Sequence, residues 1–110
     1  MVSCAALRGE VWACALPQPI GPHPVMVLTV DRVAGPLASV TVAVVTGTRE
    51  AETTHVAVGP ESDLRRHDES YVNCSDLHTV AKSRLRRGMG LLGGAEMRAV
   101  EKALALVLGL

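Results

Sequence analysis

Four short apolar runs rich in β-branched residues follow one another in the first half of the chain, with no helical segment between them. They cover residues 10–16, 25–30, 39–46 and 53–58, and Gly, Pro or charged residues bound them. Such runs are typical of β-strands. Parallel neighbours require a crossover of a dozen or more residues, and the links here are shorter. The first half of the chain therefore predicts a small antiparallel β-structure.

Proline and glycine separate the first two runs. They occupy positions Pro17, Pro19, Gly21, Pro22 and Pro24. Proline fixes φ and has no N–H group to donate to a sheet. We therefore predict a loop over residues 17–24 and a second strand that starts at residue 25.

The second half of the chain is more polar and ends in an amphipathic stretch. Residues 59–63 predict a turn, 64–69 a polar segment, 70–74 a further short strand and 83–87 about one helical turn. From Ala95 onward one helical face carries Met97, Val100, Leu104, Val107 and Leu108. This periodicity predicts a packing helix at the C-terminus. The expected fold class is mainly β, with antiparallel strands and a C-terminal helix.

The bulk composition limits the size of the fold and the classes of partner. With 110 residues, 48% of them apolar, the chain has material for one core, and we expect a single domain over residues 1–110. Eleven basic residues balance eleven acidic ones, so any contact with nucleic acid depends on a local patch. Trp12 and Tyr71 are the only aromatic residues, which argues against RNA readers that stack bases on several aromatic side chains.

The sequence predicts neither a cofactor nor a membrane anchor. Cys4, Cys14 and Cys74 are widely spaced, with no CxxC pair and no His cluster nearby, so we expect no disulfide framework, no metal site and no cofactor. No apolar run reaches the roughly 18 residues of a membrane helix, and the N-terminus lacks the pattern of a signal peptide. We expect a soluble cytoplasmic protein that does not contact membranes.

Several sequence blocks, taken in order, resemble the MazF/PemK family of endoribonuclease toxins. They are RGEVW, HPVMVLTVD, VAVVTGTR, SYVNCSDLHTV, SRLRR followed by GMG, and MRAVEKAL. The resemblance runs from about Leu7 to Leu110, and the joint order is more specific than any one block. It implies a small plug-like antiparallel barrel of the MazF/PemK/CcdB type, related to SH3 barrels. It also implies a homodimer that cleaves single-stranded RNA without metal and a MazE-like antitoxin that blocks the cleft.

The resemblance implies catalytic residues at two neighbouring strand ends. The catalytic Thr or Ser of the family, at the end of the third strand, matches Thr46, and the Arg before the proline of the second strand matches His23. We expect His23 to act as general acid or base and Thr46 to donate a hydrogen bond to the phosphate. Arg49 would supply a fixed positive charge, and Thr48 beside it would contact the RNA.

The His at position 23 departs from the family pattern and affects the mechanism. Attack of a 2′-hydroxyl on the phosphate requires proton transfer and stabilisation of the negative phosphorane. Arginine is permanently charged, whereas an imidazole stabilises the phosphorane only when it is protonated. Activity should therefore depend on pH near neutrality. An acidic stretch common in relatives is also replaced, by residues 17–22, which leaves Asp31, Glu50 and Asp76 as possible second acids or bases.

The densest basic run of the chain lies before the C-terminal helix. It contains Lys82, Arg84, Arg86 and Arg87. One helical turn would place Arg84 and Arg87 on the same side. These two residues are candidates for contact with the RNA backbone or with an acidic antitoxin tail.

Other interpretations of the same residues stay open at this stage. His23 is also compatible with a solvated loop residue, and Thr46 with an ordinary strand end. Trp12 is typical of a core or a dimer face. For the whole chain, the alternatives to an endoribonuclease are a non-catalytic toxin on the same scaffold, which binds a protein target such as gyrase, and a degenerate decoy for antitoxins.

Overall fold

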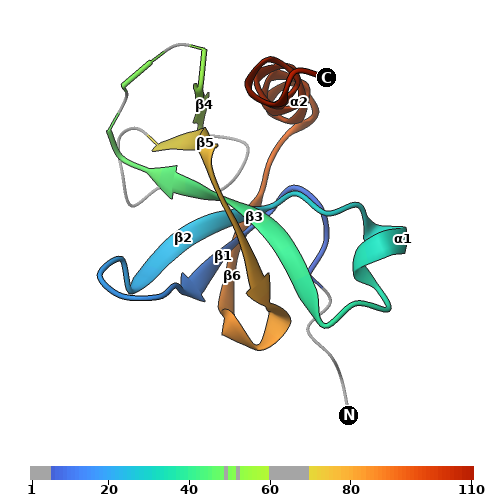
Figure 1. The fold of residues 1–110 in the computed structure, drawn as a ribbon. Helices are drawn as coiled ribbons and strands as arrows, with labels where there is room; N and C mark the ends of the chain where they lie inside the picture. The colour runs from blue at the N-terminus through green and yellow to red at the C-terminus, as the bar shows by residue number, and fades with distance from the viewer. Residues whose placement is uncertain (1–5, 49, 52, 60–69) are drawn as a thin grey trace.

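The computed structural model describes residues 6–48, 50–51, 53–59 and 70–110, which form one six-stranded sheet and two α-helices (Figure 1). The elements in chain order are β1 (Glu10–Ala15), β2 (Pro22–Val27), α1 (Asp31–Ala34), β3 (Ser39–Thr46), β4 (His55–Val58), β5 (Ser70–Ala81), a 3₁₀ turn (Lys82–Arg84), β6 (Leu85–Leu91) and α2 (Gly94–Leu108). The expected fold class, mainly β with a C-terminal helix, is confirmed.

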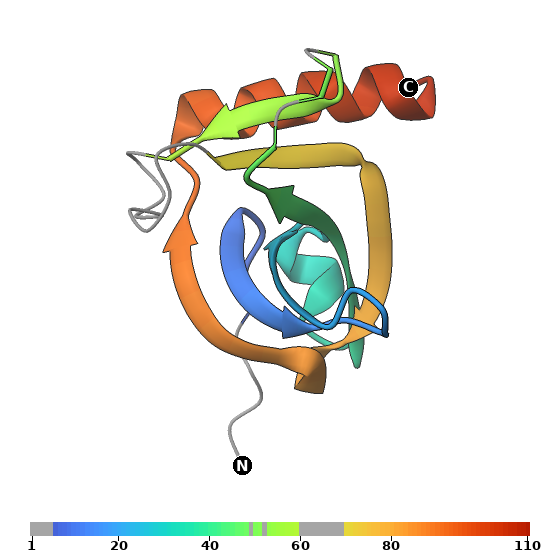
Figure 2. The same cartoon turned by 90° about the vertical axis from the view of Figure 1, so that its left-hand side faces the viewer.

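Every pair of neighbouring strands is antiparallel, and the strand order is β4-β5-β3-β2-β1-β6. The sheet is strongly curved: β5 and β6 bend round β1 to β3, and α2 lies across the end that holds β4 (Figure 2). Among the described residues β4 and β6 remain its two edges, so the barrel-like sheet is curled but not closed.

Both faces of the sheet carry apolar side chains, which explains why the strand runs are continuous rather than alternating. One face packs against α2 and includes Val11, Met26, Val72 and the helix residues Val100 and Ala103. The opposite face forms a second cluster around Cys14, Val25, Val42, Val44, Leu85 and Ala34 of α1, with Trp12 partly buried beside it. The two clusters hold the strands in a fixed register, because a slip of one residue would exchange the faces.

The helix α2 agrees with the predicted apolar stripe over its first part. Met97, Val100 and Leu104 pack on the sheet, whereas Val107 and Leu108 are exposed. At its start, the Glu96 carboxylate accepts hydrogen bonds from the N–H groups of Gly93 at 3.0 Å and Gly59 at 3.0 Å. This acidic residue therefore fixes the helix entry, where the two preceding glycines supply no side-chain cap.

Strand β2 corrects the predicted loop over residues 17–24. It begins at Pro22 and pairs with β1 through Pro22, His23 and Pro24. The β2–β3 ladder covers only Val25–Val27, so the proline-bearing half of β2 is paired on one side alone. A strand tolerates proline where no ladder bond is required from it.

Strand β5 is longer than the predicted strand over residues 70–74. It continues to Ala81, and its second half pairs with the first half of β3. Between Asn73 and Leu77 the register with β3 shifts at Ala43/Val44. The sequence pattern does not predict the strand beyond residue 74, because this half of β5 carries polar residues and is held by pairing with β3, which lies far away in the sequence.

The helical turn predicted over residues 83–87 is wrong. A 3₁₀ turn covers only Lys82–Arg84, and Leu85 starts β6, which pairs with β1. The long-range pairing overrides the local helical preference of this basic run. The short helix α1 was not predicted at all. The predicted turn and polar segment over 60–69 lie outside the described residues.

Two further findings concern the cysteines and the helices. Cys14 and Cys74 are free and buried, and Cys4 lies outside the described residues. None of the helices described is both long enough and apolar enough to cross a membrane.

Candidate active site at the ends of β2 and β3

His23 lies near the start of β2, directly opposite Cys14 of β1. Its side chain is partly buried, and its Nε2 atom is buried without a hydrogen-bond partner in the described structure. An unpaired buried nitrogen costs roughly 1–3 kcal/mol. Such groups are rare and often belong to a functional site. Of the two earlier interpretations of His23, the solvated loop residue does not fit this position.

The pairing of β2 with β3 relates His23 to Thr46. The register joins Val25 to Val44 and Val27 to Val42. His23 and Thr46 each lie two residues beyond the Val25–Val44 pair, at the ends of β2 and β3 where the ladder between the two strands has stopped. Opposed residues of antiparallel strands point to the same face, here the face that holds Val25 and Val44. The two predicted catalytic residues thus come from neighbouring strand ends and share one face.

Thr46 is the last residue of β3 and is partly exposed. Its hydroxyl oxygen accepts a hydrogen bond from the Thr48 N–H group at 3.2 Å. This bond uses an acceptor site of the hydroxyl and leaves its proton available for donation. Thr48 is exposed beside it, and Arg49 lies outside the described residues.

On the other side of His23, the row continues to β6. Cys14 opposes both His23 and Leu85. Burial raises the pKa of the Cys14 thiol, and the positive charges of Arg84 and Arg86 lower it by a smaller amount. These two guanidinium groups therefore act on the residue that adjoins His23. Because the Cys14 thiol is neutral, this residue adds no charge to the site.

The sequence predicts that one helical turn places Arg84 and Arg87 on the same side. This arrangement does not occur, because residues 85–91 form a strand. Arg87 opposes Ala13, the residue that precedes Cys14 in β1. Arg86, which we had not singled out, accompanies Arg84 in its effect on Cys14. The signal in the sequence was the apolar Leu85 between two arginines, which suits a strand with one buried side chain.

The three possible second acids or bases are engaged elsewhere. Asp31 accepts a hydrogen bond from the Arg8 N–H group at 2.8 Å, and Asp76 contacts His78 Nε2 at 2.8 Å. The carboxylate of Glu50 lies 3.6 Å from His55 Nε2. Of the acid–base candidates from the sequence, His23 is the one that lies on the strand next to β3, which ends in Thr46.

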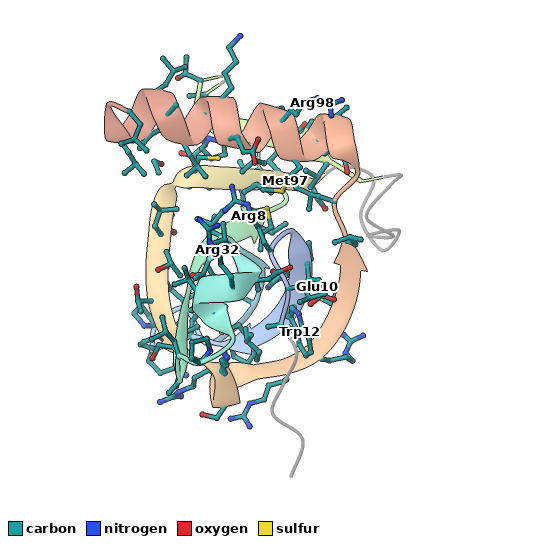
Figure 3. The ribbon with its side chains drawn as sticks, turned by 90° about the vertical axis from the view of Figure 1, so that its right-hand side faces the viewer. Arg8, Glu10, Trp12, Arg32, Met97 and Arg98 are labelled. Carbon is teal, nitrogen blue, oxygen red and sulfur yellow. The ribbon has the colours of Figure 1, made fainter. Side chains whose placement is uncertain are left out.

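Other polar groups belong to different parts of the fold. Arg8 forms an ion pair of 3.2 Å with Glu101 of α2 and donates a hydrogen bond to the Leu28 carbonyl. On β1, the Trp12 Nε1–H group donates a hydrogen bond of 3.2 Å to the Glu10 carboxylate (Figure 3). A groove of about 480 Å³ between β4 and α2 is lined by residues that include His55 and Lys102. Among the described residues, no group of three or more His, Cys, Asp and Glu side chains is arranged to hold a metal ion.

A protein-family model decides the relationship. The model, described as PemK-like, MazF-like toxin of type II toxin-antitoxin system, matches residues 7–108. The chain belongs to the PemK/MazF-like toxin family. The resemblance inferred from the sequence blocks is therefore confirmed over nearly the whole chain.

Mycobacterial proteins are among the relatives of this PemK/MazF-like toxin. Endoribonuclease MazF1 of Mycobacterium bovis is 33% identical over 106 residues, which cover 96% of this chain and 95% of that relative. A solved endoribonuclease from a mycobacterial species has a TM-score of 0.85 at 31% identity and covers 100% of this chain and 97% of its own. Another, solved in complex with its cognate antitoxin, has a TM-score of 0.84 at 32% identity, with coverage of 94% and 95%. The curved sheet with its C-terminal helix is thus the MazF-type fold.

Proposed function

We propose that this PemK/MazF-like toxin is a metal-independent endoribonuclease that cleaves single-stranded RNA. The observation that carries the proposal is the antiparallel pairing of β2 with β3, because His23 and Thr46 come from neighbouring ends of these two strands. The mycobacterial relatives are named endoribonucleases and match almost the full length of the chain. An imidazole and a hydroxyl at neighbouring strand ends are suited to acid–base chemistry on a phosphodiester.

The proposed reaction is an attack of the 2′-hydroxyl on the adjacent phosphorus. A bond forms between the 2′-oxygen and phosphorus, and the bond from phosphorus to the 5′-oxygen breaks. The proton of the 2′-hydroxyl leaves, and the 5′-oxygen gains a proton, so the products are a cyclic phosphate and a 5′-hydroxyl. His23 transfers one of these protons through its unpartnered Nε2, and Thr46 donates a hydrogen bond to a phosphate oxygen.

The proposed RNA contacts extend from this pair along both strand ends. Thr48 and Arg49 follow Thr46 in the sequence, Arg84 is the last residue of the 3₁₀ turn, and Arg87 lies near the start of β6. Their hydroxyl and guanidinium groups suit the oxygens of an RNA backbone. The proposed assembly is a cytoplasmic homodimer that a MazE-like antitoxin inhibits, which is supported by the relative solved with its cognate antitoxin.

The test is direct cleavage of RNA by the purified protein. A mixed single-stranded RNA is incubated with the protein in excess EDTA, and the new ends are mapped for cyclic phosphate and 5′-hydroxyl. The same assay is run on His23→Ala and Thr46→Ala, and on Arg98→Ala as a control, because Arg98 is an exposed residue of α2.

Cuts by the parent and by Arg98→Ala, with rates at least about 100-fold lower for the two site variants, support the proposal. Equal rates in all four proteins would overturn the assignment of His23 and Thr46. Intact RNA in every reaction, together with growth arrest when the protein is expressed, would instead support a toxin that binds a protein target such as gyrase. Intact RNA without growth arrest would support a decoy for antitoxins.

A further inference from the structure

Arg86 is the extra residue of a β-bulge in β6. Ala13 pairs with Arg87 and the next residue, Cys14, pairs with Leu85, so Arg86 has no counterpart in β1. A bulge bends its strand and redirects the side chains, and bulges are frequent beside active sites. The β-bulge at Arg86 therefore singles out this part of the edge strand β6 as a candidate functional position.

The bulge lies next to the row of residues that contains His23. Leu85 opposes Cys14, and Cys14 opposes His23. Leu85 and Cys14 are only 6% and 1% exposed, whereas Arg86 is exposed. Arg86 therefore places a charged group at the surface beside a buried row that leads to the proposed proton-transfer residue.

The charge of Arg86 is also free to meet a ligand. It forms no hydrogen bond or ion pair with any other described residue, in contrast to Arg8, which is held by Glu101. Its positive charge, together with that of Arg84, acts on the Cys14 thiol. The described pairing brings the Cys14 thiol of β1 to His23, and the charges that act on this thiol are those of the two arginines.

The proposed reaction needs such a group. A histidine that accepts a proton must start neutral, and a neutral imidazole does not stabilise the phosphorane. A guanidinium is charged at all relevant pH values and offers a planar pair of N–H donors to two phosphate oxygens. We propose that Arg86, directed by the bulge, binds the phosphate under attack and supplies the permanent charge that His23 cannot supply. This inference rests on the proposed endoribonuclease function.

The test compares Arg86→Ala, Arg86→Gln and Arg86→Lys with Arg98→Ala, which removes one equal charge from α2. Steady-state cleavage of a short RNA is measured from pH 5.5 to 9, and thermal unfolding confirms that each variant is folded. We expect Arg86→Ala and Arg86→Gln to lower kcat by about 100-fold, because loss of one group that stabilises the transition state has effects of this size. Arg86→Lys should recover part of the loss, and Arg98→Ala should match the parent.

The split between kcat and KM provides a readout that a structural role would not change. Because Arg86 is proposed to stabilise the transition state, its loss in Arg86→Gln should lower kcat and kcat/KM by the same factor and leave KM near that of the parent. A variant that only raises KM, with kcat and the pH profile unchanged, would show that Arg86 binds RNA uniformly and would overturn the proposal. If the parent protein does not cleave RNA, the proposed function itself fails; if the parent cleaves and Arg86→Gln cleaves equally well, only the role of Arg86 fails.

Discussion

His23 and Cys14 oppose each other directly across the β1–β2 ladder, and the thiol separates the imidazole from Leu85 on the next strand. The buried thiol, which is neutral because burial raises its pKa, and the buried side chain of Leu85 form an apolar surface on one side of the histidine. On its other side β2 pairs with β3, and Thr46 is the last residue of that strand. The histidine therefore has a packed, apolar neighbour on β1 and its proposed catalytic partner at the end of β3.

Replacement of His23 by Arg should make cleavage much less dependent on pH. The guanidinium stays charged, so it stabilises the phosphorane at every pH, but it does not transfer protons near neutrality. We expect the slope of log kcat between pH 5.5 and 7.5 to fall by at least half in His23→Arg. Rate measurements over this range, with Arg98→Ala as the control, check the result. An unchanged slope would show that another group titrates.

Replacement of Thr46 by Val should remove activity without loss of folding. Val keeps the shape of the side chain and suits a strand end, but it lacks the hydroxyl that is proposed to bond the phosphate. We expect kcat to fall by about 100-fold in Thr46→Val and by less than about 10-fold in Thr46→Ser, which keeps the hydroxyl. Single-turnover cleavage measures both. Equal activity in Thr46→Val and the parent would exclude the proposed bond.

Stability should decrease at alkaline pH because of Cys74. Its thiol is fully buried, and burial raises the pKa from 9.0 to about 11. As the pH rises above 9.0, the unfolded chain loses this proton first, so the free energy of unfolding falls until the pH passes about 11. The loss should approach roughly 2 kcal/mol.

Urea unfolding at pH 8, 10 and 11 tests this pH dependence. Cys74→Ala is the matched variant, because it has a cavity but no thiol to titrate. Its stability at pH 8 should be lower than that of the parent, and its further fall up to pH 11 should be smaller. Parallel curves for the two proteins would assign the alkaline loss to other groups.

Removal of a large side chain from the sheet face that packs against α2 should strongly lower the free energy of unfolding. Met26 is 0% exposed and belongs to the cluster that joins the sheet to α2. Met26→Ala should lower the free energy of unfolding by about 2–5 kcal/mol. Leu106→Ala, at a position that is 64% exposed, should change it by less than about 0.5 kcal/mol. Chemical denaturation measures both, and similar losses would contradict the assigned core.

The sequence was sufficient for the strands whose side chains are apolar on both faces. The run over residues 39–46 coincides with β3, and the predicted packing helix coincides closely with α2. Both signals are local, because each residue is buried by its own position in the element.

The second half of β5 and the whole of β6 could not be predicted in this way. Residues 75–81 carry Ser, Asp, His and Thr, and β6 starts with Leu85, Arg86 and Arg87. These segments are strands because of pairing with β3 and β1, which lie far away in the sequence. The resemblance suggested His23 and Thr46 as site residues, whereas the bulge that singles out Arg86 depends on the long-range pairing of β6 with β1.

The bulge of β6 has a consequence for how this chain tolerates insertions and deletions. Loss of Arg86 itself would remove the irregularity between Ala13 and Cys14 and keep Leu85 and Arg87 opposite their present partners. Loss of any single residue between positions 82 and 85 would instead force an arginine into the slot that Leu85 now fills, against the apolar cluster. Length variants that remain folded but inactive should therefore map to one position of β6, while deletions just before it yield insoluble protein.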